Sequence, residues 1–114
     1  MSEHPTASQR ISEAVGAWPG VEVGSGDPGE TEFTIDGHEI GHLHGDRAAH
    51  FGFPKEVGAA LREQGRVGPH PVNPRTTRWA ARRIDTDDDA RDVIELLRLN
   101  YDRIVQQRGE QAGV

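Results

Sequence analysis

The chain lacks cysteine, is poor in aromatic residues and has no long apolar run. The absence of cysteine excludes disulfides, thiolate metal ligands and cysteine nucleophiles, so any metal would need histidine or carboxylate ligands. Aromatic residues make up only 5%, so we expect an aliphatic core and few stacking partners for large flat ligands. No stretch approaches the ~18 apolar residues of a membrane span, and no signal-peptide pattern opens the chain. We therefore expect a cytoplasmic protein without a membrane partner.

Basic residues are outnumbered by acidic ones. Lys and Arg total 13 against 19 Asp and Glu, which gives a formal net charge of −6. Affinity for phosphate backbones depends on Lys and Arg, which release counterions when they bind. The charge balance therefore argues against nucleic acid as a general partner, although a local basic patch would keep that alternative open.

The length of 114 residues fits a single domain with one modest core. Residues 1–29 read as an N-terminal helix and a glycine-rich loop, because a Thr6-x-x-Gln9 capping box opens the segment and Pro19-Gly20 stops the helix. Residues 30–107 form the expected α+β core. Residues 108–114 are expected to be a tail that frays.

The core segment contains a clear meander signal. Asp36-Gly37 favours a two-residue hairpin turn between strands at 32–35 and 38–44, because both residues tolerate the positive φ of a type I′ turn. Gly45-Asp46 is a second two-residue turn candidate, and a third strand at 47–53 follows it. We predict a three-stranded antiparallel meander.

The second half of the core alternates helices with irregular chain. A helix is expected from Pro54 to the C-cap Gly65, an irregular proline-rich loop at 68–74, a strand at 77–84 and a long helix after Thr86. The apolar stripe of this long helix comprises Ala90, Val93, Ile94, Leu97, Tyr101, Ile104 and Val105. The predicted fold is α+β, an antiparallel sheet of four to five strands with helices packed on one face.

The run His38-Glu39-Ile40-Gly41-His42 matches the zincin pattern H-E-x-x-H. That chemistry requires a helix, because only an i, i+4 helical spacing brings both imidazoles to one zinc. Here the run follows a hairpin turn and contains a glycine, so we predict a strand. His38 and His42 then cannot share a metal in the zincin manner.

On a strand, His42 and His44 project from the same face, about 7 Å apart in Cα. Pairing through a two-residue Gly45-Asp46 turn would place Ala49 opposite His42 and send His50 to the other face. That leaves His70 or Asp46 as a third ligand. We predict a hydrogen-bonded histidine network at the rim of the core, with no metal ligand, no cofactor and no catalytic residue. The alternative is a metal- or small-ligand-binding enzyme that uses the His42 and His44 strand together with His70.

A basic cluster surrounds Trp79, and it comprises Arg75, Arg78, Arg82 and Arg83. Such a stripe beside an aromatic residue can hold phosphate or stack a base, which would suit a weak nucleic-acid binder. We favour another interpretation, in which Trp79 anchors the core and the arginines pair with acids such as Asp85, Asp87 and Asp88.

Several short segments together resemble the small luciferase-domain family of bacteria, archaea and fungi. They are IGHLHGD at 40–46, FPKEV at 53–57, GRV at 65–67 with PHP at 69–71, RW at 78–79 and IELLRLNY at 94–101. The order of elements more distantly resembles the MmcQ/YjbR group, small α+β proteins with an antiparallel sheet backed by helices, for which DNA binding has been suggested. The family name implies light-emitting oxygenase chemistry, but the resemblance carries no catalytic residue to this chain. We expect a non-catalytic module that binds a small ligand or a protein, with binding residues His42, His44, His70, Arg78 and Trp79.

Overall fold

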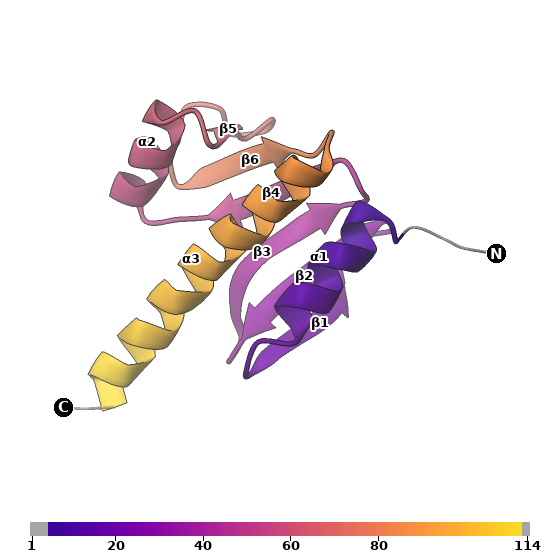
Figure 1. Ribbon diagram of the computed structural model, residues 1–114. Coiled ribbons are helices and arrows are strands. Elements are labelled where there is room, and N and C mark those ends of the chain that lie inside the picture. The colour runs from indigo at the N-terminus through magenta and orange to yellow at the C-terminus, as the bar shows by residue number, and fades with distance from the viewer. Residues whose placement is uncertain (1–4, 113–114) are drawn as a thin grey trace.

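The computed structural model describes residues 5–112, with side chains described for residues 5–109. The elements in chain order are α1 (Ala7–Gly16), β1 (Val21–Ser25), β2 (Glu30–Ile35), β3 (His38–His44), β4 (Ala48–Gly52), α2 (Lys55–Glu63), β5 (Gly68–Pro69), β6 (Trp79–Arg83) and α3 (Asp87–Ala112). All strand pairs are antiparallel, and the sheet has the order β1-β2-β3-β4-β6-β5. Figure 1 shows α1 and α3 side by side across one face of the sheet, with α2 beside β5 and β6. The predicted α+β class and the helices on one face are confirmed.

The sheet has six strands, more than the four to five predicted. β1 pairs along its whole length with β2. β5 corrects the prediction of an entirely irregular loop at 68–74, because Gly68 and Pro69 pair with Ala81 and Ala80 of β6. A proline is tolerated there since β5 is the edge strand, where its missing N–H leaves no ladder bond unmade.

Local sequence signals account for the ends of these elements. Thr6 caps α1 through the predicted capping box with Gln9. The β2–β3 turn has φ of 50° at Asp36 and 79° at Gly37, as a type I′ turn requires. The long helix α3 continues through Ala112, beyond the end of its apolar pattern. No helix in the described part of the chain is long and apolar enough to cross a membrane.

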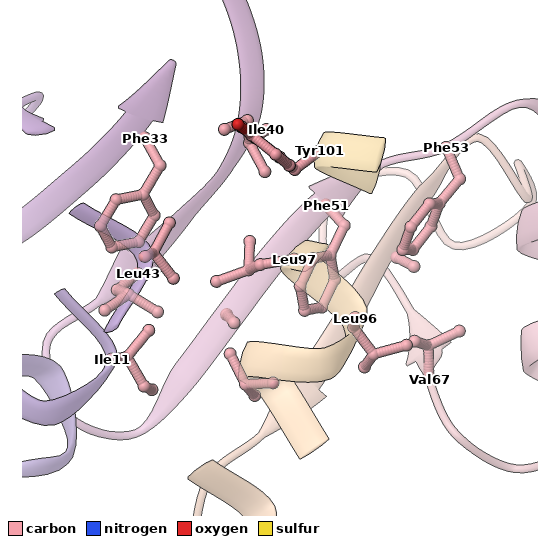
Figure 2. Packing of buried hydrophobic residues seen from close by; sticks show 14 of the residues in the cluster. Ile11, Phe33, Ile40, Leu43, Phe51, Phe53, Val67, Leu96, Leu97 and Tyr101 are labelled. Atoms are coloured by element: carbon pink, nitrogen blue, oxygen red, sulfur yellow. The ribbon is translucent and has the colours of Figure 1, made fainter. Parts of the chain in front are cut away.

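The core lies between the sheet and the helices α1 and α3. Figure 2 shows Phe33 and Leu43 of the sheet near Ile11 of α1, and Phe51 near Leu96 and Leu97 of α3, and all of these side chains are fully buried. The buried face of α3 also includes Asn100, which the apolar pattern could not reveal and which is 0% exposed. Its side-chain amide donates to the carbonyls of Ile40 at 2.8 Å and Gly52 at 3.0 Å, so it ties α3 to β3 and β4.

A β-bulge interrupts β3 where α3 crosses it. Phe33 pairs with Gly41 and Thr34 pairs with Glu39, so Ile40 is the extra residue. A Cβ at Gly41 would lie 2.6 Å from Leu97 Cδ2 and 2.9 Å from the His50 carbonyl oxygen, so only glycine allows this approach of helix and sheet. Because one residue is absorbed by the bulge, Glu39 and His42 share a face of the sheet, although an uninterrupted strand would place them on opposite faces.

Candidate metal centre

The predicted strand at 38–44 is confirmed, since β3 spans His38–His44, and this geometry excludes a zincin site. The predicted pairing with the next strand is wrong. His44 pairs with Ala48 and His42 pairs with His50, so the connection contains Gly45, Asp46 and Arg47. A shift of one residue reverses the face to which every side chain of a strand points. His50 therefore joins His42 and His44 on the face opposite α1 and α3.

The apolar pattern contains the signal for this register. Leu43, Ala49 and Phe51 are all fully buried on the helix-covered face, so the residues that alternate with them must face the other way. The predicted register placed Ala49 opposite His42, on the face of His42 and His44, and so left Leu43 on the other face. Assigning Leu43 to the core would have identified His50 as the third histidine of the group.

The three imidazoles lie close together. Nε2 of His42 is 3.0 Å from Nε2 of His44. The ring centroid of His50 lies 4.2 Å from that of His44 and 5.2 Å from that of His42. One nitrogen from each of His42, His44 and His50 can be chosen so that all three lie within 4.8 Å of one another. We call these residues the histidine cluster.

Carboxylates stand behind two of these rings. Nδ1 of His42 is 3.0 Å from Glu39 Oε2, a contact that the bulge at Ile40 makes possible. Nδ1 of His44 is 3.8 Å from Glu30 Oε2. In both rings the carboxylate lies at Nδ1, while Nε2 points toward the neighbouring imidazole. This is the arrangement by which carboxylates orient metal-binding histidines and raise their basicity.

The electrostatic surroundings differ between the rings. The hydrogen bond with Glu39 raises the pKa of His42 above its usual value, and the same contact lowers the pKa of Glu39. Burial and, to a smaller extent, the neighbouring imidazoles together lower the pKa of His50 to about 4. At neutral pH His50 is uncharged and keeps a lone pair for a ligand or a hydrogen bond.

Negative charge surrounds the histidine cluster. Glu32 lies opposite His42 and Glu30 opposite His44 on β2, and Glu39 is bonded to His42. Within residues 5–109, none of these three carboxylates forms an ion pair with an arginine or lysine. Among the described side chains, the cationic partners of Glu39 and Glu30 are therefore imidazoles, those of His42 and His44, and not arginine or lysine.

His70 lies beside the histidine cluster without joining it. Its ring centroid is 4.6 Å from that of His50, and its Nδ1 accepts hydrogen bonds from the backbone N–H groups of Val72 and Asn73. Because Nδ1 is occupied as an acceptor, the proton of the neutral ring resides on Nε2. Burial lowers the pKa of His70, which favours this neutral form. His70 therefore offers an N–H donor at the edge of the cluster.

The other predicted binding residues lie further away. Trp79 is 38% exposed and faces Gly52, so the prediction that it anchors the core is wrong. Its ring centroid is 6.1 Å from that of His70, on the same side as the histidine cluster. Arg78 precedes β6 with an exposed side chain, and its carbonyl accepts from the Phe53 N–H at 2.7 Å. The structure thus brings His70 and Trp79 to the cluster, but not the Arg78 side chain.

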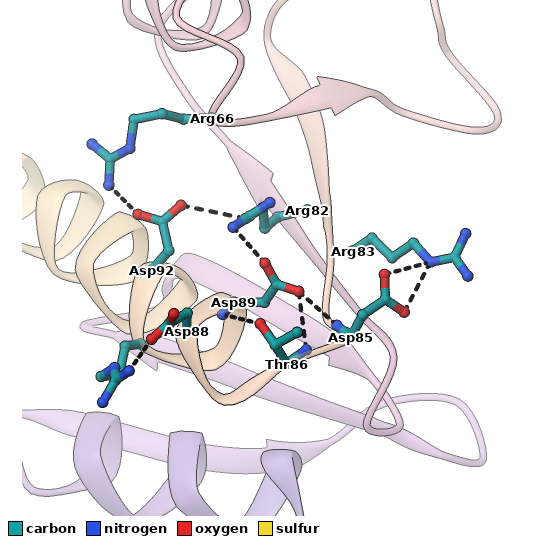
Figure 3. A network of polar contacts seen from close by, with 9 residues as sticks. Arg66, Arg82, Arg83, Asp85, Thr86, Asp88, Asp89 and Asp92 are labelled. Carbon is teal, nitrogen blue, oxygen red and sulfur yellow. Dashed lines mark hydrogen bonds and ion pairs between the residues drawn. The ribbon is translucent and has the colours of Figure 1, made fainter.

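Arg82 and Arg83, two of the four arginines of the basic cluster, are paired with acids, as Figure 3 shows. Arg82 contacts Asp89 at 2.8 Å and Asp92 at 3.3 Å, and Arg83 contacts Asp85 at 3.1 Å. The predicted pairing with acids is confirmed for Arg82 and Arg83, although Asp87 and Asp88 pair instead with Arg10 and Arg91. Arg75 and Arg78 are exposed and separate from this network.

The side chains of the candidate centre that the sequence reasoning missed are His50, Glu39 and Glu30. A family model described as the luciferase domain matches residues 37–100, which is more than half of the chain and includes the histidine cluster. No curated protein and no solved structure matches the chain. The chain therefore belongs to the luciferase-domain family.

Proposed function

We propose that this protein is a binding module for a divalent transition-metal ion of the zinc class, held by His42, His44 and His50. One observation carries the proposal. The three imidazoles lie close together, and carboxylates stand at Nδ1 of two of them, His42 and His44. This proposal keeps the predicted binding module and names a ligand for it. It replaces the expectation of a purely hydrogen-bonded network, which rested on the wrong strand register.

The spacing of the nitrogens suits a shared metal. Two nitrogen ligands of one tetrahedral zinc stand about 3.3 Å apart when each Zn–N bond is about 2.0–2.1 Å. The Nε2 atoms of His42 and His44 are 3.0 Å apart, and one nitrogen of each of the three rings lies within 4.8 Å of the others, so the His50 ring would draw closer to complete the set. Without metal, one proton shared between two nitrogen lone pairs holds the rings together. A cation would take the place of that proton.

The chemistry of the ligands narrows the ion. Imidazole nitrogens suit Zn²⁺, Cu²⁺, Ni²⁺ and Fe²⁺, whereas Mg²⁺ and Ca²⁺ prefer oxygen ligands. Glu30, Glu32 and Glu39 add a negative field that attracts any cation, and Glu39 fixes the tautomer in which His42 binds through Nε2. We expect Zn²⁺ to bind tightly and Mg²⁺ to bind weakly.

A direct test is metal content and thermal stability of protein from which any histidine tag has been removed. We expect elemental mass spectrometry to find about one zinc per chain. We also expect the melting temperature to rise when zinc is added. A ligand present at 100 times its Kd stabilises the folded state by about 2.7 kcal/mol if it does not bind the unfolded chain. His42→Ala, His44→Ala and His50→Ala should each lose this gain, measured against the same variant without zinc.

His38→Ala is the matched control, because His38 lies on the same strand with an exposed side chain outside the cluster. It should keep the wild-type zinc response. Equal zinc binding in all four variants, or no zinc response in the wild type, would refute the proposal.

Metal-dependent catalysis is the second candidate function. Three protein ligands leave the fourth position of a tetrahedral ion open, as catalytic zinc sites do, and His70 places a donor beside the cluster. Substitution of Co²⁺ for zinc tests the open position. Added azide should change the visible absorption of the cobalt protein if the position is open, whereas an unchanged spectrum would limit the site to a structural or storage role.

A further inference from the structure

A separate cavity of about 220 Å³ lies between the start of β3 and the C-terminal half of α3. Its lining residues are His38, Glu39, Arg103, Ile104, Gln107 and Arg108. Two arginines and one glutamate give this cavity a net positive formal charge within a chain whose total charge is −6. The cavity does not contain any nitrogen of the histidine cluster.

Arg103 is held by two neutral side chains, the buried Asn100 and the exposed Gln107. Its Nε and Nη2 donate to Asn100 Oδ1 at 2.9 and 2.7 Å, and its Nη1 donates to Gln107 Oε1 at 3.3 Å. Asn100 is itself fully buried and anchored to the carbonyls of Ile40 and Gly52. A guanidinium has five N–H donors, so two of the donors of Arg103 have no partner among the described side chains. The guanidinium of Arg103 is therefore held in one orientation, and two of its N–H donors remain available to a ligand.

The other charges that line the cavity are already balanced. Glu39 is bonded to His42, and Arg108 is paired with Asp36. Arg103 contacts no carboxylate within residues 5–109, and burial lowers its pKa because its charge is removed from water without a counterion nearby. A partly buried cation normally has an anionic or strongly polar partner. The uncompensated charge of this cavity is that of Arg103.

We propose that the cavity binds a small oxyanion, the carboxylate or phosphate group of a small molecule, against the guanidinium of Arg103. The planar fork of an arginine suits the paired oxygens of either group and forms charge-assisted hydrogen bonds with them. Arg108 and His38 at the cavity wall add further donors. This site is distinct from the proposed metal centre, and neither proposal depends on the other.

The test is an NMR titration of the full chain in metal-free buffer, prepared with a chelating resin because soluble chelators are themselves polycarboxylates. Inorganic phosphate and acetate form separate arms, and sodium chloride at equal ionic strength is the reference. We expect saturating shifts of the Arg103 Nε–Hε signal and of the backbone signals of residues 38–39 and 103–108 with at least one of the two anions. The arm that saturates at lower concentration identifies the preferred source of the oxyanion.

Arg103→Gln should weaken binding at least tenfold, and Arg103→Lys should retain part of it. Arg91→Gln is the matched control, because it removes one positive charge from an exposed position near the other end of α3. If Arg103→Gln does not fold, the saturation of the Arg103 side-chain signal in the wild type still decides the question. Shifts that grow linearly and equally with phosphate, acetate and chloride, or equal binding by Arg103→Gln, would overturn the proposal.

Discussion

His42 and His50 face each other across β3 and β4, yet their surroundings favour opposite charge states. His42 is bonded to a carboxylate, which favours the protonated ring, whereas His50 is 8% exposed and adjoins other imidazoles, which favours the neutral ring. A metal requires every ligand ring to be neutral at its binding nitrogen. His50 is already suited to that role, and His42 must release a proton from Nε2 whenever its ring is charged.

We predict separate titrations for these two rings in the metal-free protein. His50 should titrate near pH 4, and His42 above the ordinary value of about 6.5. The lowered pKa of His50 contributes stability that is complete above about pH 6.5 and is lost as the pH falls toward 4. The raised pKa of His42 contributes stability that is complete below about pH 6.5 and is lost as the pH rises through its folded value. Ring-proton or ring-nitrogen NMR shifts report both midpoints, and two rings that titrate together near 6.5 would contradict this assignment.

In the proposed metal centre, Glu39 is not a ligand but is bonded to the ligand His42. Glu39→Gln removes the charge behind His42 Nδ1 while keeping the shape of the side chain. We predict a zinc affinity that is about 10–100-fold weaker, as is usual when a carboxylate behind a histidine ligand is lost. Calorimetric zinc titration measures the change. Glu22→Gln, at an exposed position of β1, is the control and should bind as the wild type does.

The H-E-x-x-H run shows how much one residue pattern can convey. The sequence correctly excludes the zincin site, because Asp36-Gly37 makes the run a strand. It does not reveal that Glu39 and His42 still meet, since that contact depends on the bulge at Ile40. Alternation along a strand can be counted from the sequence. The bulge, in contrast, depends on the packing of Gly41 against α3, and α3 lies far from Gly41 in the chain.

At the scale of elements, local sequence signals are enough to predict the helices and most strands, but they do not predict how the strands pair. Capping and turn residues predict α1, the β2–β3 hairpin and the start of α3. The β3–β4 register depends on whether the connection has two or three residues, and Gly45-Asp46-Arg47 suits either length. The deciding information is the apolar alternation of Leu43 and Ala49 outside the turn, because burial of both against the helices selects the longer turn.

The start of α3 depends on one carboxylate. Asp89 Oδ2 accepts from the backbone N–H groups of Asp85 at 2.8 Å and Thr86 at 3.0 Å, and Thr86 Oγ1 accepts in return from the Asp89 N–H. These bonds, with the nearby Arg82, lower the pKa of Asp89 below its usual value. The ionised group therefore stabilises the helix at pH values above about 4, and this contribution is lost as the pH falls through the lowered pKa.

We predict that Asp89→Asn destabilises the protein at pH 7 and that its difference from the wild type shrinks in acid. Urea unfolding followed by circular dichroism at pH 7 and pH 3 measures both differences. Asp102→Asn, with an exposed side chain further along α3, should show little change at either pH. A difference for Asp89→Asn that is independent of pH would mean that the bonds matter but the charge does not.

At the scale of the whole molecule, the sheet separates two roles. One face packs against α1 and α3 to form the core, and the other carries the histidine cluster. The resemblance that the sequence shows to the luciferase-domain family is confirmed by the family match, whereas the resemblance to the MmcQ/YjbR group stays a prediction. The face that carries the histidine cluster is harder to predict than the core, because apolar periodicity marks buried faces and leaves polar faces undefined.

Leu97 tests the packing of the helix layer. It is fully buried at the centre of α3, and it lies against Gly41 at the bulge. We predict that Leu97→Ala lowers the free energy of unfolding by about 2–5 kcal/mol, since the deleted atoms leave a cavity. Val72→Ala, at a position 78% exposed, should change it by less than about 0.5 kcal/mol. Denaturant unfolding gives both values, and a loss below about 1 kcal/mol for Leu97→Ala would contradict the described packing.

The most direct measurement of the proposed metal centre is a crystal structure of the zinc-soaked protein with data collected at the zinc absorption edge. We predict one strong anomalous peak on the sheet face opposite α1 and α3, about 2.0–2.1 Å from a nitrogen of each ring of the histidine cluster. The peak should disappear in crystals of His50→Ala. A map without a peak at the cluster, in which His42 and His44 remain hydrogen-bonded to each other, would contradict the proposed metal centre.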